Sequence, residues 1–180
     1  MKYSITIPLL LLFLFGGACK EESRVIPDIY WGEITALKNG VPWQGEIRAN
    51  LNKLEGDGFN ISVGVYNENA IKIEFLSIVK IPLQQGYNIV DTLLFPEDTV
   101  IRSTSASYGL SHGDAQLAFY YVLEEDGFVN YINVTSYNET TREVKGEFEI
   151  AYLETRAESI PDTVRFTNGK FYTRINEKDK

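Results

Sequence analysis

Apolar and polar residues alternate along most of this chain, which is the pattern of β-strands with one face in a core and the other in water. The clearest stretch runs from Val144 to Tyr152. One face carries Val144, Phe148, Ile150 and Tyr152, and the other carries Lys145, Glu147 and Glu149. The pattern recurs in Phe59, Ile61, Val63 and Val65 and in Ile71, Ile73 and Phe75. We expect each apolar set to face the core.

The segment from Ala115 to Leu123 is apolar on both faces. Leu117, Phe119 and Tyr121 alternate with Ala118, Tyr120 and Val122. This pattern predicts a strand that is central in its sheet or covered on both sides.

Turn residues separate these runs. Asn39-Gly40 is the pair that tolerates the positive φ angles of a type I′ hairpin turn. Further turns are predicted at Glu55 to Gly58, Asn67 to Asn69, Glu124 to Gly127 and Asn138 to Thr141. Asn168-Gly169 indicates either another hairpin or a bulge in one long last strand. The whole pattern predicts an all-β fold, an antiparallel meander of about nine or ten strands that forms a sandwich or an up-and-down barrel.

The first residues resemble a bacterial lipoprotein signal peptide. Lys2 is followed by an apolar run from Ile5 to Phe15 and by the small residues Gly16-Gly17-Ala18 before Cys19. Cleavage there would make Cys19 the lipidated first residue. A membrane anchor and a simple secretory signal are the alternatives, and in the second case Cys19 has no role.

The chain therefore divides into four predicted parts. These are a signal peptide (1–18), a tether (19–28), a single β domain (29–176) and a charged tail (177–180). Lys20-Glu21-Glu22 resembles the short export signal of Bacteroidota lipoproteins, with a plain charged spacer as the alternative. The expected location is the outer membrane, lipid-anchored and at the cell surface, or otherwise its periplasmic face.

Composition narrows the classes of partner. The net charge of −8 argues against nucleic acid, which needs a basic patch, and assigns the membrane link to the lipid anchor. Cys19 is the single cysteine, so the domain has no disulfide and no thiolate metal ligand.

Several stretches resemble a group of uncharacterised Bacteroidota lipoproteins, known only as domains of unknown function. They are Ala36-x-x-Asn39-Gly40-x-x-Trp43, Gly86-Tyr87, Val134-x-x-Tyr137, Val144-x-Gly146-x-Phe148-x-Ile150 and Thr167-Asn168-Gly169-x-Phe171. The resemblance implies a β-rich surface or periplasmic domain and assigns no catalytic or ligand residue.

No catalytic, cofactor or metal residue is predicted. The single histidine, His112, lies in the loop-like stretch Ser111 to Asp114, without the signature of a catalytic partner. Paired carboxylates lie in the tether and in turns, and their spacing does not show the two different environments that acid/base catalysis needs. No acidic loop matches the ligand spacing of an EF-hand.

Two weaker patterns concern binding and modification. Eleven tyrosines with Trp31 and Trp43 suggest an aromatic platform for a sugar or apolar ligand, although strands and core edges also favour these residues. Asp-Thr-apolar triplets make Thr92, Thr99 and Thr163 candidate O-glycosylation sites, although such triplets also begin strands.

We therefore expect a non-enzymatic binding or accessory module that contacts a glycan, a protein or a small apolar ligand. A structural subunit of an envelope complex is the main alternative, and a hydrolase with unrecognised residues is the third.

Lipidation gives the first testable prediction. Cys19→Ala removes the thiol that would carry the lipid, so the variant should lose its partition into membranes. The measurement is incorporation of labelled fatty acid in growing cells. Equal labelling of the parent and the variant would rule out Cys19 as the acceptor.

Overall fold

A computed structural model describes residues 31–52, 58–92, 103–154 and 163–176, which form eleven strands. The strands are β1 (Gly32–Lys38), β2 (Val41–Leu51), β3 (Gly58–Tyr66), β4 (Lys72–Pro82), β5 (Gly86–Ile89), β6 (Asp91–Thr92), β7 (Ser105–His112), β8 (Ala115–Val122), β9 (Tyr131–Tyr137), β10 (Glu143–Glu154) and β11 (Thr163–Asn176). Within these residues no helix is long and apolar enough to cross a membrane.

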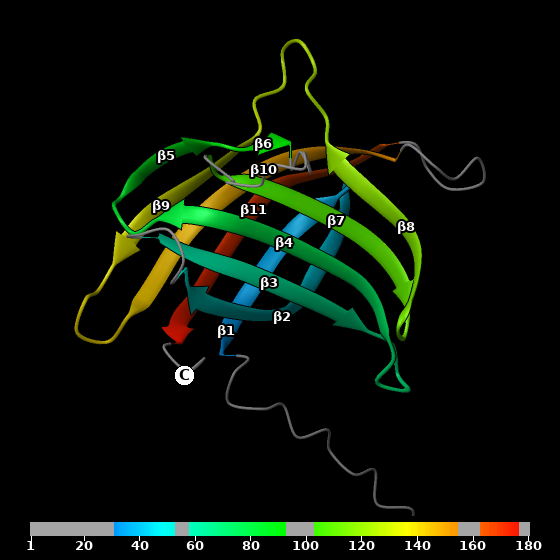
Figure 1. Cartoon of the computed structure of the whole chain (residues 1–180), viewed down its shortest axis with the longest axis horizontal. Coiled ribbons are helices and arrows are strands. Elements are labelled where there is room, and N and C mark those ends of the chain that lie inside the picture. Colours follow the sequence, from blue (N-terminus) through cyan, green and yellow to red (C-terminus); the bar gives the residue numbers. More distant parts are fainter. Residues whose placement is uncertain (1–30, 53–57, 93–102, 155–162, 177–180) are drawn as a thin grey trace, which may run out of the picture.

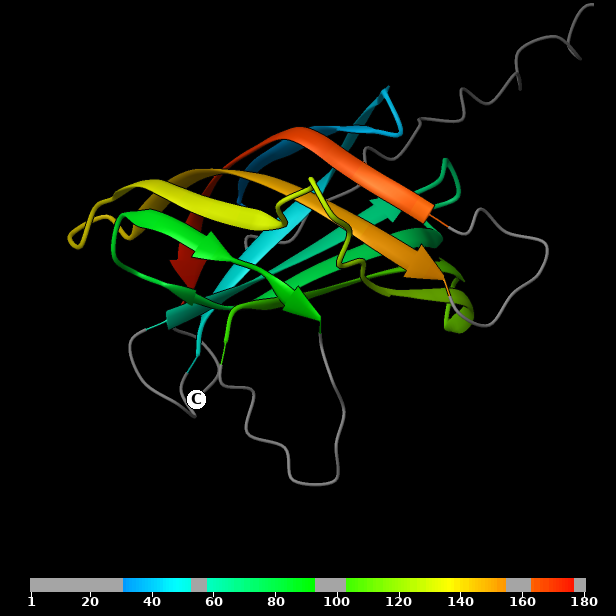
Figure 2. The same ribbon diagram turned by 90° about the horizontal axis from the view of Figure 1, so that it is seen from above.

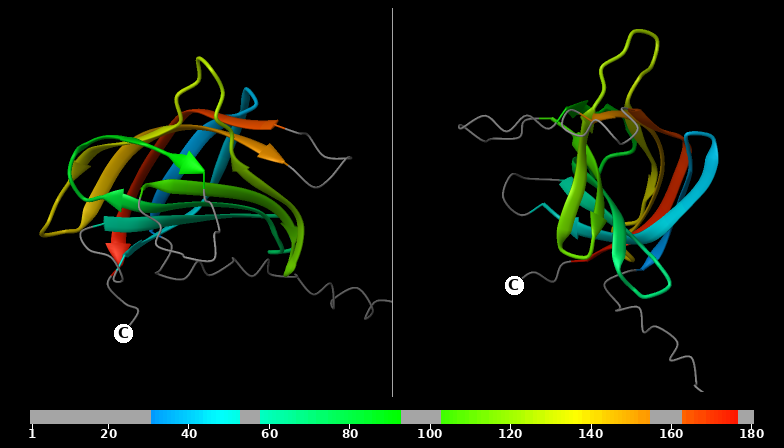
Figure 3. Two further views of the ribbon diagram at one scale, coloured as in Figure 1. Left: turned by 45° about the horizontal axis from the view of Figure 1, so that its top comes forward. Right: turned by 90° about the vertical axis from the view of Figure 1, so that its right-hand side faces the viewer.

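Eight of the strands close into an antiparallel barrel, shown in Figures 1 and 3. Their order around the ring is β1, β2, β3, β4, β7, β8, β10 and β11, and β11 pairs again with β1. Apart from β5, β6 and β9, strands that are neighbours in the ring also follow one another along the chain, as in an up-and-down barrel. The predicted all-β antiparallel fold is confirmed. The strand number exceeds the expected nine or ten because β5 and β6 are short pieces inserted between β4 and β7.

The barrel has two ends. The start of β1 and the end of β11 lie at one end, which we call the terminal end, because Gly32 pairs with Thr173. The turns β1–β2, β3–β4 and β7–β8 lie at the other, the hairpin end. Figure 2 shows the strands crossing between the two ends.

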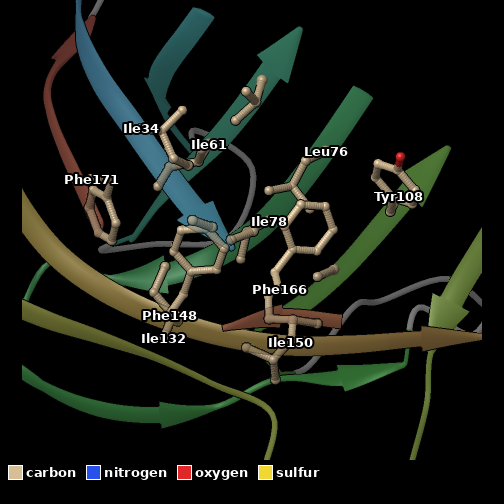
Figure 4. Packing of buried hydrophobic residues seen from close by; sticks show 14 of the residues in the cluster. Ile34, Ile61, Leu76, Ile78, Tyr108, Ile132, Phe148, Ile150, Phe166 and Phe171 are labelled. Atoms are coloured by element: carbon tan, nitrogen blue, oxygen red, sulfur yellow. The ribbon is translucent and has the colours of Figure 1, made fainter. Parts of the chain in front are cut away.

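Large apolar side chains fill the inside of the barrel (Figure 4). The prediction for β10 is confirmed, since Val144, Phe148, Ile150 and Tyr152 are buried whereas Lys145 and Glu147 are exposed. In β3, Phe59, Ile61 and Val63 are buried and Val65 packs against the core, also as expected.

The prediction for β4 is wrong by one position. Leu76 and Ile78 are buried inside the barrel, whereas Phe75 and Ile73 lie on the outer side and are half-buried. Both faces of this strand carry apolar residues, so alternation alone could not set its phase. Phe75 packs outside the barrel against Phe119, with ring centroids 6.1 Å apart.

The strand β8 is central as expected, because it pairs with β7 on one edge and with β10 on the other. The described residues do not cover its outer face. Leu117 is 57% exposed there, and Phe119 and Tyr121 are half-buried with ring centroids 5.1 Å apart.

Local turn chemistry largely follows the sequence. Asn39 and Gly40 have φ angles of 50° and 80°, as a type I′ turn requires. Asn138 Oδ1 accepts hydrogen bonds from the N–H groups of Thr140 and Thr141. Asn168 has a φ of 52° within the continuous strand β11, opposite a shift in register, so Asn168-Gly169 is a bulge rather than a hairpin. The predicted turn at 55–57 lies outside the described residues.

The strand β10 changes partner along its length. Its first part pairs with β9 and its last part with β8. At the change, Asn130 accepts a hydrogen bond from the N–H of Ala151 (2.7 Å) and donates one to the carbonyl of Leu123 (2.8 Å). The Asn130 carbonyl also accepts from the N–H of Val90 (3.0 Å). The side chain and the main-chain carbonyl of one buried residue thus supply hydrogen-bond partners for backbone N–H and C=O groups at the point where the strands separate.

Phe148→Ala should lower the free energy of unfolding by about 3–5 kcal/mol, because it empties a fully buried site in β10. Glu147→Ala, on the exposed face of the same strand, should change it by no more than about 0.5 kcal/mol. Denaturant unfolding of both variants measures this difference. A larger loss in Glu147→Ala than in Phe148→Ala would contradict the orientation of β10.

Candidate functional site

A polar group lies among the aromatic residues inside the hairpin end. The Glu74 carboxylate accepts hydrogen bonds from Trp43 Nε1 (2.9 Å) and the Tyr108 hydroxyl (3.0 Å). Its other oxygen pairs with Lys38 Nζ at 2.5 Å. Both carboxylate oxygens are therefore engaged by the protein, which makes Glu74 a structural anchor and a poor candidate for proton transfer.

Aromatic rings pack around this group. Tyr108 contacts Tyr120, Tyr152 and Phe166, with ring centroids 5.2, 5.8 and 5.3 Å away. Burial, followed by the Glu74 charge, raises the pKa of Tyr108, and burial raises that of Tyr152. These rings occupy the space in which an eight-stranded barrel could hold a small ligand.

The best candidate for a binding site is a hollow of about 280 Å³ on the outer face of β2, β3 and β4. We call it the outer groove. Its lining includes two aromatic side chains and several hydrogen-bonding ones: Tyr66, Phe75, Arg48, Asn50, Ser62, Lys72 and Ser77. Such a mixture of apolar walls and a few polar groups is typical of ligand sites.

Strand register builds the floor of the outer groove. Arg48 pairs with Ser62, and Ser62 pairs with Ser77, so these side chains form one row across three strands. Arg48 Nε also donates to Asn50 Oδ1 (3.1 Å), which holds the guanidinium beside the row. Short hydroxyl side chains keep the floor low and offer both donors and acceptors.

The aromatic walls lie over glycines. A Cβ on Gly64 would be 2.7 Å from the Tyr66 ring, and one on Gly109 would be 2.3 Å from the Phe75 ring. Only glycine leaves room for rings that lie this close to the sheet. Sequence patterning missed the outer groove, because these outward residues have no motif and Phe75 was expected in the core.

A second hollow, of about 330 Å³, is lined by residues of the three neighbouring strands β1, β2 and β3. It shares Gly64 and Tyr66 with the outer groove, so Tyr66 borders both. Glu33, Gln44 and Glu46 line the second hollow and supply hydrogen-bond acceptors. The two hollows together place cationic side chains on one side of Tyr66 and carboxylates on the other.

The structure separates the two tryptophans of the suggested platform. Trp43 lies inside the barrel against Phe166, with centroids 4.8 Å apart, and Trp31 lies outside at the terminal end against Tyr172. A different aromatic pair occurs on β5 and β9, where the exposed Tyr87 stacks on the half-buried Tyr131 with centroids 4.5 Å apart.

The candidate modification sites lie apart from the outer groove. Thr92 ends β6 and Thr163 begins β11, and both are half-buried. Thr99 lies outside the described residues, as do Cys19, Lys20, Glu21 and Glu22.

Two stretches match the spacing of serine-nucleophile motifs, and both lie in strands. Gly109 to Gly113 reads Gly-x-Ser-x-Gly, a motif that acts at a strand-to-helix turn, but here it leads from β7 through a hairpin into β8. Its Ser111 hydroxyl donates to the carbonyl of Lys72 (3.0 Å). Ser77 and Lys80 have a spacing that aligns side chains on a helix, whereas β4 is extended.

His112 is exposed at the end of β7. The described residues contain no group of three or more His, Cys, Asp or Glu side chains that could hold a metal ion. No family model, curated protein or solved structure matches this chain.

The aromatic group inside the barrel gives a stability prediction. The Tyr152 hydroxyl is fully buried and has no hydrogen-bond partner among the described residues. Tyr152→Phe should therefore raise the free energy of unfolding by about 1 kcal/mol. Tyr108→Phe should lower it by about 1–3 kcal/mol, because it removes a hydrogen bond to a carboxylate.

The measurement is denaturant unfolding as a function of pH. The raised pKa values mean that the unfolded chain loses these tyrosine protons first, so stability should fall above the ordinary pKa of 10.0. Tyr152→Phe should weaken this alkaline fall. Destabilisation by Tyr152→Phe at neutral pH would show that its hydroxyl is satisfied.

Proposed function

We propose that this protein is a lipid-anchored, surface-displayed binding module that holds a neutral glycan chain in the outer groove. The observation that carries the proposal is the combination, on one outer face, of aromatic walls formed by Tyr66 and Phe75 with a floor of hydroxyl and amide groups. Sugars need both, because a pyranose ring has apolar C–H faces and a rim of hydroxyl groups.

The polar lining suits an uncharged ligand. Arg48 and Lys72 supply donors in the outer groove, and Glu33 and Glu46 supply carboxylates in the second hollow. Sugar hydroxyls donate and accept, so one chain can use both sets. An acidic polymer would meet the two carboxylates and a protein of net charge −8.

The size of the hollows supports the same ligand class. Each is near the lower limit of small-molecule pockets, about 300 Å³. Each therefore suits a unit of the size of one sugar ring, and a chain can continue past Tyr66 from one hollow to the next. An extended polymer on an open sheet face needs no deep cavity.

The filled barrel favours this outer site over an inner one. Tyr108, Tyr120 and Phe166 pack against one another where a carrier would hold its ligand. The lipoprotein signal supports display at the membrane, and Lys20-Glu21-Glu22 supports export to the surface. A non-enzymatic role agrees with the engaged carboxylate of Glu74 and the bonded hydroxyl of Ser111.

The test is affinity electrophoresis through native gels that contain a soluble neutral polysaccharide: xylan, mannan or an α-glucan. At least one polymer should retard the parent protein. Tyr66→Ala and Phe75→Ala should each weaken binding about tenfold, as the loss of one aromatic contact of about 1.4 kcal/mol implies.

Tyr87→Ala is the matched control, because Tyr87 is an aromatic residue, 54% exposed, on a strand outside the groove. It should bind as the parent does, and melting temperatures should show that all variants are folded. Lack of retardation by every neutral polymer, or equal loss in Tyr87→Ala, would reject the outer groove as a glycan site.

A further inference from the structure

Two aromatic rings with a cation over each form a ladder on the outer surface at the terminal end. Arg174 lies over the Trp31 ring at 5.2 Å, and Lys145 lies over the Tyr172 ring at 4.7 Å. The two rings meet edge to face, with centroids 5.2 Å apart and planes at 72°. We call these four residues the cation–aromatic ladder.

The ladder is held by strand pairing. Tyr172 pairs with Lys145 of β10 on one side and with Glu33 of β1 on the other. The buried Thr173 hydroxyl donates to the carbonyl of Trp31 (2.6 Å), which fixes the backbone of the first described residue. Both rings stay half-exposed, and Lys145 and Arg174 are exposed.

The ladder lies where the chain leaves the barrel toward the predicted lipid. Trp31 is twelve residues after Cys19, so the connection spans at most about 40 Å even when fully extended. Among the described residues, Trp31 is therefore the one closest along the chain to the predicted lipid.

We propose that the cation–aromatic ladder is the surface with which the anchored barrel contacts the lipid headgroup layer. This inference rests on the lipid anchor of the proposed function. Trp and Tyr favour the membrane interface because their rings are apolar and their N–H and O–H groups are polar. Lys145 and Arg174 lie over these rings with their charged ends exposed, where they can pair with lipid phosphates at the same interface.

Charge near the ladder is balanced. Glu33 pairs with Tyr172 in the sheet. Burial raises the pKa of Tyr172 most, and the charge of Glu143 and its hydrogen bond to Tyr172 raise it further. The contact therefore does not require a strongly anionic membrane. Insertion of the two rings provides the attraction, and the two cations orient the barrel.

The proposed contact leaves the outer groove accessible. The ladder centres on β11, and the groove centres on β3, three places away in the ring of eight strands. A barrel that rests on β10, β11 and the start of β1 turns β3 and β4 away from the bilayer. The membrane contact and the outer groove thus lie on nearly opposite sides of the barrel, whereas the second hollow, which Glu33 lines, borders the contact.

Tryptophan quenching in vesicles tests this inference. The lipidated full chain and its Trp31→Phe variant are reconstituted into phosphatidylcholine vesicles with bromine atoms on the upper acyl chain. Trp43 is an internal control, because it is 8% exposed inside the hairpin end. We expect quenching in the parent and loss of that quenching in Trp31→Phe.

The outcomes separate the two proposals. Vesicle association with equal quenching in parent and variant would overturn the ladder contact and leave the lipid anchor standing. Failure of the lipidated protein to associate with vesicles would overturn the anchor and the inference together. Replacing Lys145 and Arg174 by Glu should reduce quenching while vesicle association persists, and unchanged quenching would overturn the role of these cations.

Discussion

Closure of the sheet depends on the hydrogen bonds that Asn130 makes where β10 leaves one partner and takes another. A strand that changes neighbours leaves N–H and C=O groups without a ladder, and such groups are costly when buried. The Asn130 side chain bonds Ala151 and Leu123, and its carbonyl bonds Val90. A buried amide replaces the missing strand, so β8 and β9 can both border β10 without an open seam.

Two different layers of aromatic residues follow from this closure. Inside, Tyr108, Tyr152 and Phe166 pack around a charge pair and make the barrel solid at the hairpin end. Outside, Tyr66 and Phe75 lie over glycines and form walls that stand on the sheet. The outer rings are held by the backbone beneath them, so a ligand would find them already in place.

Much of the fold could be predicted because period two is a local property. The faces of β3 and β10, the Asn39-Gly40 turn and the class of fold follow from it. Barrel closure could not be predicted, because it depends on long-range pairing such as that of β1 with β11. The prediction of which β4 side chains face the core failed for a related reason, since Phe75 packs on the outer side over Gly109 of a neighbouring strand. The outer groove was hidden for the same reason, because Arg48, Ser62 and Ser77 meet only through register.

The row formed by Arg48, Ser62 and Ser77 on the outer face has a consequence for how this scaffold can change over evolutionary time. Its residues alternate with Ile61, Val63, Leu76 and Ile78, which are buried on the other side of the same strands. The inward side chains are therefore constrained by packing inside the barrel, and the outward ones are not. Outward substitutions such as those at Ser62 and Ser77 would leave the inward side chains in place, so the outer surface can vary while the packing inside the barrel is kept.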